Sequence, residues 1–404
     1  MSIQWVDNRI PKTDDRFRSV MSPENVQKAR LLHASFPQYS QTPLAALSDL
    51  ARDLGVGGIF VKDESYRFGL NAFKALGGSF AIACYIADAL GKDMTEVDYS
   101  FLISTQCKDQ LGQVTFFSAT DGNHGKGVAW AAKQLGQKAV IRMPKGSSLI
   151  RLNSIAKEGA VVTIEDANYD ECVRIAAREA SQTPQGVVIQ DTSWAGYETI
   201  PIRIIQGYGT MAVEASEQLR EAGVHQPTHV FVQAGVGSLA AAVLGYFSAL
   251  YLGHAPVSVV MEAEEANCLY QSAKAADGHR RIVEGDLNTI MAGLACGEPN
   301  PIAWDLLRNH ASFFVSCPDW VASLGMRILG APLKGDMRVI SGESGAVGVG
   351  LLVTLMKDHR YQNLRQALRL DRYSQVLLFS TEGDTDPDSY RNVVWNGYLP
   401  YRQA

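Results

Sequence analysis

The sequence contains few cysteines, and they lie far apart. Six are spread over 404 residues, and none forms a C-x-x-C pair with another. Paired spacings are typical of zinc sites and redox motifs, and dense cysteine frameworks are typical of secreted disulfide-bonded domains. The pattern therefore predicts reduced, mostly buried thiols in a reducing compartment, with no metal site.

Long hydrophobic runs are also missing. The longest apolar stretch, 239–252, is interrupted by Gly245 and is shorter than the ~20 residues that a membrane span needs. Residues 1–17 mix acidic and basic side chains, without the apolar segment of a secretory signal. These absences predict a cytoplasmic protein with no membrane partner.

Positive charge is not in excess. The 37 Lys and Arg residues stand against 42 Asp and Glu residues, which gives a formal net charge of -5. A nucleic-acid-binding protein needs a basic face, so no nucleic-acid partner is expected. The composition, 46% hydrophobic and 20% charged, is ordinary for a folded enzyme. The length favours two domains or one large α/β domain with an insertion.

Apolar, β-branched runs alternate with helical patterns, which predicts parallel sheets wound with helices. The chain has no internal repeat and no linker rich in proline or serine, so two domains would have to be interleaved in sequence. Strands are expected at 58–64, 114–119, 139–144, 160–164, 187–191, 228–234, 257–262 and 375–381, and helices at 75–90, 123–135, 170–181, 202–222, 238–252, 320–329 and 346–357.

The segment 71–78 places Lys74 between a predicted strand and an apolar helix. The positive end of a helix dipole disfavours a cation. This field, together with desolvation by Phe73 and Leu76, is expected to favour the neutral, nucleophilic amine. Lys74 is therefore a candidate catalytic residue, although an exposed surface lysine is the common alternative.

A second segment, 120–127, follows the strand predicted at 114–119 and contains three glycines. A strand, a glycine-rich turn and a helix N-terminus together form an anion site of exposed amides. An Asp-Gly turn with an asparagine cap is the structural alternative. His124 alone is more often a structural histidine than a catalytic one.

A third segment, 234–239, also joins a strand to a helix, and its glycines would let the backbone approach a phosphate. With Ala240 it also reads G-x-G-x-x-A, and Glu262 ends the next predicted strand where a ribose-binding acid is expected. A nicotinamide-dependent dehydrogenase is therefore the main rival interpretation. It would leave Lys74 and the 120–127 segment without a role.

A fourth segment, 380–386, brings hydroxyls to the carboxyl end of a predicted strand, where sites of α/β proteins open. Such a hydroxyl could bond a ring nitrogen, and a polar turn without a ligand is the alternative. Asp191 likewise ends a predicted strand, and its structural alternative is a helix cap.

Taken together and in this order, the four segments resemble fold type II pyridoxal-phosphate-dependent enzymes and, among them, the diaminopropionate ammonia-lyases. The resemblance runs from about Thr42 to Trp395. It implies two interleaved, open twisted α/β domains with mostly parallel sheets: a large cofactor-binding domain, 1–74 and 166–404, and a small domain, 75–165, that carries the substrate loop. The segments that carry it are FGLNAFKALGG, TDGNHGKGVAWAA, QDTSWAGY, QAGVGSLA, MAGLACGEPNP, ISGESGAVG and STEGDTD.

The resemblance implies that Lys74 holds pyridoxal 5'-phosphate as a Schiff base and that Asn123 contacts the phenolic oxygen of the cofactor. Ser380 or Thr381 would contact the pyridine nitrogen, with Ser380 preferred. Glu343 is a candidate for the cofactor edge, although its segment also reads as a loop that leads into a helix. The amides that would cradle the phosphate belong to Gly235, Val236, Gly237, Ser238 and Leu239.

For the substrate, the resemblance implies contacts from Thr120, Asp121 and Asp191, with Lys74, Asp121 and Asp191 as the catalytic residues. The implied reaction of this carbon–nitrogen lyase is α,β-elimination of 2,3-diaminopropionate, as D and L isomers, to pyruvate and two ammonia molecules. The resemblance also implies a homodimer.

Two positions depart from the wider superfamily. Ala72 stands where its dehydratases often carry serine, and Asp121 stands where a small neutral residue is common. Both weaken the alternative of a serine or threonine dehydratase, because a carboxylate suits a substrate with a second ammonium. A catalytically inactive or regulatory binder on the same fold is a third possibility, since fold does not guarantee activity.

Overall fold

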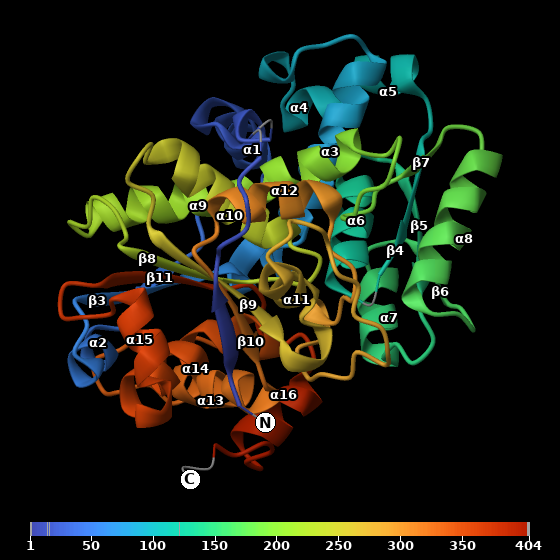
Figure 1. Cartoon of the computed structure of the whole chain (residues 1–404). Coiled ribbons are helices and arrows are strands. Elements are labelled where there is room, and N and C mark those ends of the chain that lie inside the picture. The colour runs from blue at the N-terminus through green and yellow to red at the C-terminus, as the bar shows by residue number, and fades with distance from the viewer. Residues whose placement is uncertain (1, 14, 16, 121, 402–404) are drawn as a thin grey trace. The chain divides into compact units, whose positions relative to one another are not determined.

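The computed structural model describes residues 2–13, 15, 17–120 and 122–401. The chain separates into two units, each assembled from segments that are distant in sequence (Figure 1). Unit 1 comprises Met1–Ser22, Gln41–Tyr66 and Met211–Ala404, and unit 2 comprises Pro23–Ser40 and Arg67–Thr210.

Unit 1 contains a seven-stranded sheet in the order β1-β10-β9-β8-β11-β3-β2. The inner pairs are parallel, and the outermost strands, β1 and β2, pair antiparallel with their neighbours. The central strands are buried along nearly their whole length, as expected where helices cover both faces. The strands are β1 (Gln4–Asp7), β2 (Leu44–Ala46), β3 (Gly58–Asp63), β8 (His229–Gln233), β9 (Val257–Ala263), β10 (Phe313–Cys317) and β11 (Gln375–Ser380).

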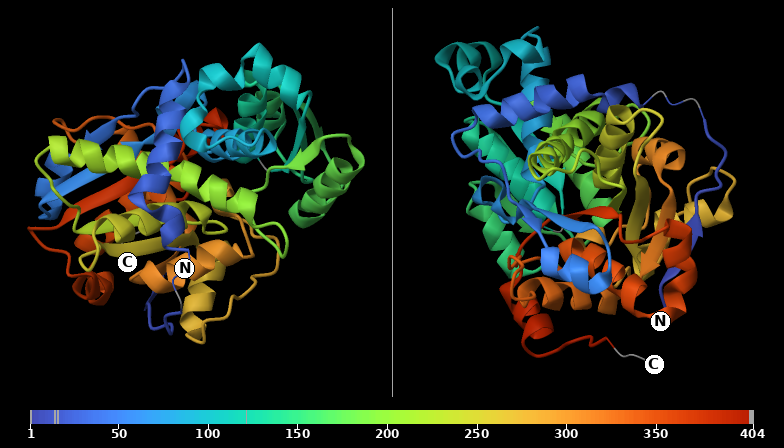
Figure 2. Two further views of the ribbon diagram at one scale, coloured as in Figure 1. Left: turned by 90° about the horizontal axis from the view of Figure 1, so that it is seen from above. Right: turned by 90° about the vertical axis from the view of Figure 1, so that its left-hand side faces the viewer.

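Helices of unit 1 lie on both faces of this sheet: α10 on one, and α13 and α14 on the other (Figures 1 and 2). The α-helices are α2 (Ser48–Leu54), α10 (Ser238–Leu250), α11 (Cys268–Ala275), α12 (Pro301–His310), α13 (Asp319–Gly330), α14 (Glu343–Lys357), α15 (Gln362–Leu368) and α16 (Pro387–Val394). The 3-10 turns are η1 (Ser19–Met21), η4 (Glu264–Ala266), η5 (Ala292–Leu294) and η6 (His359–Tyr361), and η2 (Glu64–Gly69) crosses the unit boundary.

Unit 2 contains a four-stranded, fully parallel sheet in the order β6-β5-β4-β7. Helices α6 and α8 lie on opposite sides of it (Figure 1). Its strands are β4 (Thr115–Ala119), β5 (Lys138–Met143), β6 (Val161–Ile164) and β7 (Gly186–Val188). Its helices are α1 (Pro23–Ser35), α3 (Ala75–Ala89), η3 (Met94–Glu96), α4 (Tyr99–Leu102), α5 (Thr105–Leu111), α6 (Asn123–Gln134), α7 (Leu149–Ala156) and α8 (Tyr169–Gln182), with the first part of α9 (Thr199–Glu221).

All eight strands and all seven helices expected from the sequence are present, and the sheets are mostly parallel as expected. The strand expected at 187–191 is shorter, because ladder pairing of β7 with β4 ends at Val188. The small domain expected at 75–165 omits α8 and β7. In the structure these elements belong with unit 2, since β7 pairs with β4 and α8 packs on the same sheet.

Glycines let two helices approach α3 closely within unit 2. A side chain at Gly127 on α6 would lie 2.8 Å from the Ala75 backbone, and one at Gly207 on α9 would overlap the Leu76 carbonyl oxygen. Backbone contact of this kind leaves no room for a Cβ atom. The start of α3, directly after Lys74, is therefore held on two sides.

Candidate active site

Lys74 directly precedes α3 as its N-cap residue. Its Nζ atom lies 5.6 Å from the centre of the Phe73 ring and 5.8 Å from that of Tyr208, and these two rings pack with centroids 4.7 Å apart. Burial raises the pKa of Tyr208 above its usual range, against the charge of Lys74, which lowers it. The lysine therefore lies beside two aromatic rings, and the phenol of Tyr208 is neutral.

Asp191 is the anionic partner of Lys74. Its Oδ2 atom lies 2.5 Å from Lys74 Nζ, and the residue is only 5% exposed. Burial by itself would raise the pKa of Asp191, but the charges of Lys74 and His124 outweigh it and lower the pKa to about 2. The carboxylate is thus ionised at neutral pH, and it is not the cap of a helix, because α9 begins only at Thr199.

His124 contributes to this ion pair from the first turn of α6. Its Nδ1 atom lies 3.9 Å from Asp191 Oδ2, and its Nε2 atom is 2.9 Å from the carbonyl oxygen of Ile189. A carbonyl can only accept, so Nε2 carries a proton. The His124 ring is buried, and its effect on the site is to lower the pKa of the neighbouring Asp191 carboxyl.

The predicted substrate loop lies between β4 and α6. Thr120 is buried, and its hydroxyl accepts the backbone N–H of Gly122 at 2.9 Å. Asn123 is the first residue of α6. Asp121 lies outside the described residues, so its predicted role stays a prediction.

Gly237, in the middle of the predicted phosphate loop 235–239, is the N-cap residue of α10. Gly237 has a φ of +100°, and a Cβ atom there would lie 3.2 Å from both Ala303 and Leu307. The first N–H groups of a 13-residue helix follow it, and such groups bind anions. The loop therefore presents backbone N–H groups at a helix start, and its role as the phosphate site stays a prediction.

Asn300 supports this loop, and sequence reasoning missed it. Its backbone N–H donates to the Val236 carbonyl at 2.8 Å, and its side chain donates to the Ser238 hydroxyl at 2.9 Å. The same side chain caps α12 by accepting the N–H of Ile302. The signal in the sequence is the Asn-Pro pair, a typical helix start.

The two candidate hydroxyls for a pyridine nitrogen lie at the carboxyl end of β11: Ser380 is its last residue, Thr381 follows it, and both are buried. Ser380 shares a 2.8 Å hydrogen bond with Ser341. Thr381 accepts a 2.9 Å bond from the Gln233 side chain, so its own proton remains available for donation. Ser341 and Gln233 were not foreseen, and the choice between Ser380 and Thr381 stays open.

Glu343 is the first residue of α14, and Ser389 donates a hydrogen bond to its carboxylate. The helix start foreseen as one interpretation of this segment is therefore present. Its contact with a cofactor stays a prediction.

Glu262 is the acid that the rival dehydrogenase interpretation would use to bind a ribose, but its side chain caps helix α11 instead. It is fully buried, and its carboxylate accepts the N–H groups of Leu269 at 2.8 Å and Tyr270 at 2.6 Å in the first turn of α11. Burial raises the pKa of Glu262 to about 8, although these bonds act to lower it. A carboxylate closed off in this way cannot bind a ribose.

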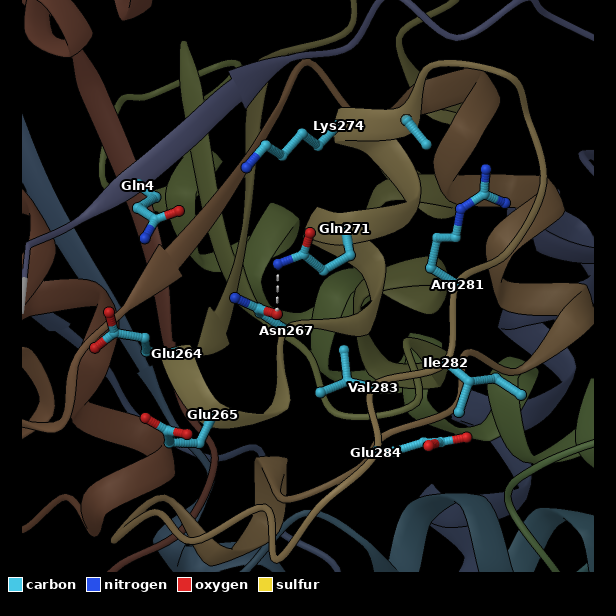
Figure 3. Close-up of a pocket in the computed structure, with 11 residues that line it drawn as sticks. Gln4, Glu264, Glu265, Asn267, Gln271, Lys274, Arg281, Ile282, Val283 and Glu284 are labelled. Carbon is cyan, nitrogen blue, oxygen red and sulfur yellow. Dashed lines mark hydrogen bonds between the residues drawn. The ribbon is translucent and has the colours of Figure 1, made fainter.

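A pocket of about 730 Å³ lies in unit 1 beside α11 (Figure 3). None of the predicted site residues lines it. Figure 3 shows the carboxylates of Glu264 and Glu265 on the side opposite Arg281, which pairs with Asp277. Its lining residues are Gln4, Glu264, Glu265, Asn267, Gln271, Lys274, Ala275, Arg281, Ile282, Val283 and Glu284.

In the described part of the chain, no cluster of three or more His, Cys, Asp or Glu side chains is arranged to hold a metal ion. Within the same residues, every helix is too short or too polar to cross a membrane.

Comparison with known proteins gives a consistent result. Residues 36–369 match the family described as pyridoxal-phosphate dependent enzyme. A diaminopropionate ammonia-lyase from Salmonella typhimurium is 54% identical over 366 residues, which are 90% of each chain.

Solved structures of diaminopropionate ammonia-lyase from Escherichia coli are also similar to this chain. One, in complex with D-serine, is 46% identical, with a TM-score of 0.90 over 99% of this chain and 98% of that one. Another, in complex with an aminoacrylate–pyridoxal-phosphate azomethine reaction intermediate, has a TM-score of 0.88 at 46% identity over the same shares.

Proposed function

Because the chain belongs to the family of pyridoxal-phosphate-dependent enzymes and, within it, to the diaminopropionate ammonia-lyases, we propose that it converts 2,3-diaminopropionate and water to pyruvate and two ammonia molecules. The identity of 54% to a named lyase over 90% of both chains supports this activity. The observation that carries the proposal to the site is the ion pair between the partly buried Lys74, directly before the apolar helix α3, and the buried Asp191.

The residues present fit pyridoxal 5'-phosphate. Unit 2 supplies an amine in an aromatic setting, and unit 1 supplies the start of α10 with Gly237 in the left-handed conformation. Lys74 would hold the cofactor covalently, the amides of 235–239 would bind its phosphate, and Asn123 its phenolic oxygen. Ser380 or Thr381 would contact the pyridine nitrogen.

When bound, the cofactor supplies the electron sink for removal of the Cα proton. Lys74 is the base that takes this proton from one face of the substrate. Asp191 holds the lysine in place and balances its charge, which stabilises a partly buried cation. A hydroxyl at the pyridine nitrogen, unlike a carboxylate, does not force that nitrogen to stay protonated, which favours elimination.

Asp121 is proposed as the base for the opposite face, so that both enantiomers react. An Asp121→Asn variant keeps the side-chain shape but removes the basic lone pair. We expect the rate for D-diaminopropionate to fall by ~10²–10⁴-fold, the usual cost of losing a general base, and the rate for the L-isomer to fall distinctly less. Both isomers are assayed side by side; equal losses would make Asp121 a binding residue.

Substrate choice follows from the same carboxylate. A site built around Asp121 leaves the charge unpaired when the β-group is a neutral hydroxyl, and an unpaired charge in a closed site is costly. The enzyme should therefore use 2,3-diaminopropionate far better than serine or threonine. Equal turnover of serine or threonine would make it a hydroxy-amino-acid dehydratase.

A cytoplasmic location and a homodimer complete the proposal. The cytoplasmic location is supported by six cysteines with no paired spacing. The dimer rests on the family resemblance alone. Light scattering of the purified protein measures the mass, and a value near 44.0 kDa, the mass of one chain, would contradict the dimer.

The most direct test records the absorbance spectrum of purified protein before and after addition of 2,3-diaminopropionate, with pyruvate measured in parallel. A visible cofactor band that responds to the substrate, together with pyruvate release, is the expected result. A bound nicotinamide, or a band without pyruvate, would contradict the proposal.

A further inference from the structure

The backbone that carries Asp191 leaves the sheet just before this residue. β7 is an edge strand of the four-stranded sheet. Its ladder with β4 ends at Val188, and one more bond follows, from the N–H of Ile189 to the Phe117 carbonyl at 2.8 Å. Gln190 and Asp191 lie beyond this point, so the position of Asp191 depends on bonds other than strand pairing.

The Tyr197 hydroxyl supplies two of these bonds. It accepts the N–H of Gln190 at 2.8 Å and donates to the Val188 carbonyl at 3.0 Å. The Tyr197 side chain thus makes the hydrogen bonds that a further strand would make on this side of Val188 and Gln190, and Gln190 directly precedes Asp191. Burial raises the pKa of Tyr197 above its usual range, which keeps the donating proton in place at assay pH.

A tight turn brings Tyr197 back to the strand. Trp194 and Tyr197 form an isolated antiparallel bridge, and Gly196 between them has a φ of +84°. The two rings stack with centroids 4.2 Å apart and an interplanar angle of 16°. Stacking on Trp194 restricts the orientation of the Tyr197 ring, so the position of its hydroxyl is fixed.

The side chain of Gln190 also holds this segment in place through hydrogen bonds of its own. Its side-chain carbonyl accepts the N–H of Ala119 at 3.0 Å and the Ser118 hydroxyl at 3.1 Å. Its amide donates to the Tyr169 hydroxyl at 2.6 Å. The residue before Asp191 is therefore tied to β4, to α8 and to Tyr197.

We propose that Tyr197 is a positioning residue that sets the distance between Asp191 and Lys74 and thereby the proton affinity of the Lys74 nitrogen. The inference rests on the proposed function in that this nitrogen is the one bound to the cofactor. Tyr197 acts through the backbone, since its hydroxyl bonds to Gln190 and Val188. The attraction between two charges weakens as their separation grows, so a looser strand end weakens the hold of Asp191 on the nitrogen.

Among the described residues of unit 2, the titratable groups that interact electrostatically with the Lys74–Asp191 pair are His124 on α6, Tyr208 on α9 and Tyr197 itself. We expect His124 and Tyr208 to stay in place when the Tyr197 hydroxyl is removed, because its hydrogen bonds go to Gln190 and Val188. A change in the proton affinity of the nitrogen in a Tyr197 variant therefore reports on Asp191.

The test uses the holoenzyme with Tyr197→Phe, which keeps the stacked ring and removes only the hydroxyl. The matched control is Tyr361→Phe in unit 1, where another buried tyrosine accepts a backbone N–H, that of Ile3. The main readout is the pH midpoint of the visible absorbance of the Lys74-bound cofactor. The rate constants kcat and KM and the melting temperature are measured as well.

We expect the pH midpoint to fall by about half a unit to one unit, which corresponds to a roughly 3- to 10-fold lower proton affinity of the Lys74 nitrogen. The rate constant kcat should fall, and KM should change by a smaller factor. The control should keep the wild-type midpoint. A Tyr197→Phe midpoint equal to that of the control overturns the inference, whatever the melting temperatures.

If Tyr197→Phe fails to fold, Tyr169→Phe takes its place, with a smaller fall expected, and an unchanged midpoint there overturns the inference. If wild-type protein holds the cofactor on Lys74 but forms no pyruvate, the proposed function fails while the midpoint comparison still decides on Tyr197.

Discussion

The two units contribute opposite kinds of chemistry. In unit 2, the partly buried Lys74 forms an ion pair with the buried Asp191, and His124 lies beside it. In unit 1, the predicted phosphate loop and the two candidate hydroxyls at the end of β11 are supported by neutral side chains, among them Asn300 and Gln233. Charges act strongly when buried, whereas backbone amides act through their geometry. Mutations should therefore affect chemistry in unit 2 and cofactor affinity in unit 1.

The largest effect is expected from Lys74→Ala, which removes both the covalent attachment and the base. Turnover should fall by at least ~10⁴-fold, the upper end of what one general base contributes. Borohydride reduction of the wild type should attach a pyridoxyl group to Lys74, as peptide mapping can show. Lys145→Ala, at an exposed lysine, is the control, and a label on another lysine would contradict the assignment.

Asp191→Asn tests the other half of the ion pair. We expect kcat to fall by ~10²–10⁴-fold, measured with 2,3-diaminopropionate from pH 5 to 9. The pKa of Asp191 is lowered from 3.8 to about 2, so its contribution to stability is present above the unfolded value and is lost only as the pH falls through about 2.

The deficit of this variant should therefore be constant across the assay range. A deficit that disappears at pH 5 would mean that Asp191 is not the ionised partner. Asp166→Asn, at an exposed aspartate, should behave as wild type.

Gly237→Asp tests the amide-based site of unit 1. It places a side chain and a negative charge at a φ of +100° where the phosphate is expected. A lost charge-assisted hydrogen bond costs about 1.5–3 kcal/mol, so cofactor affinity should fall by roughly 10- to 100-fold. Gly253→Asp is the control, because Gly253 also has a positive φ but open space around it.

Cofactor affinity can be measured by titrating the apoenzyme. If the two glycine variants bind the cofactor equally well, the 235–239 loop is not the phosphate site.

The smallest effect is expected at the two candidate hydroxyls, Ser380 and Thr381, at the end of β11. The variants Ser380→Ala and Thr381→Val each remove one hydroxyl, and a single hydrogen bond contributes about 0.5–1.5 kcal/mol. The one that contacts the pyridine nitrogen should lower cofactor affinity roughly 2- to 10-fold and shift the visible band. A shift in neither variant would exclude both hydroxyls.

Much of the fold could be predicted because its core strands are continuous apolar runs and its long helices are periodic. The strands that escaped prediction, β1, β2 and β10, have three to five residues. Runs this short do not distinguish a strand from a buried helix segment or a loop. Two of them pair antiparallel at the ends of the sheet, so only tertiary contacts define them.

The candidate site could be predicted where a residue type is unusual in its place, as with Lys74 before an apolar helix. Its supports could not be predicted, because their roles arise from contacts across long stretches of chain. Gln233 bonds to Thr381 and Asn300 to Ser238. Glu262 shows the reverse error: its position after a strand suggested a ligand, and only the structure shows it capping α11.

The close packing around the start of α3 has a consequence for protein engineering. Gly127 and Gly207 meet the backbone of Ala75 and Leu76, and neither glycine is among the residues proposed to contact substrate or cofactor. A saturation library at these two positions should nevertheless yield almost no active clones, because any side chain would displace the helix that follows Lys74. Libraries aimed at new substrates should therefore leave both glycines unchanged and vary the substrate loop instead.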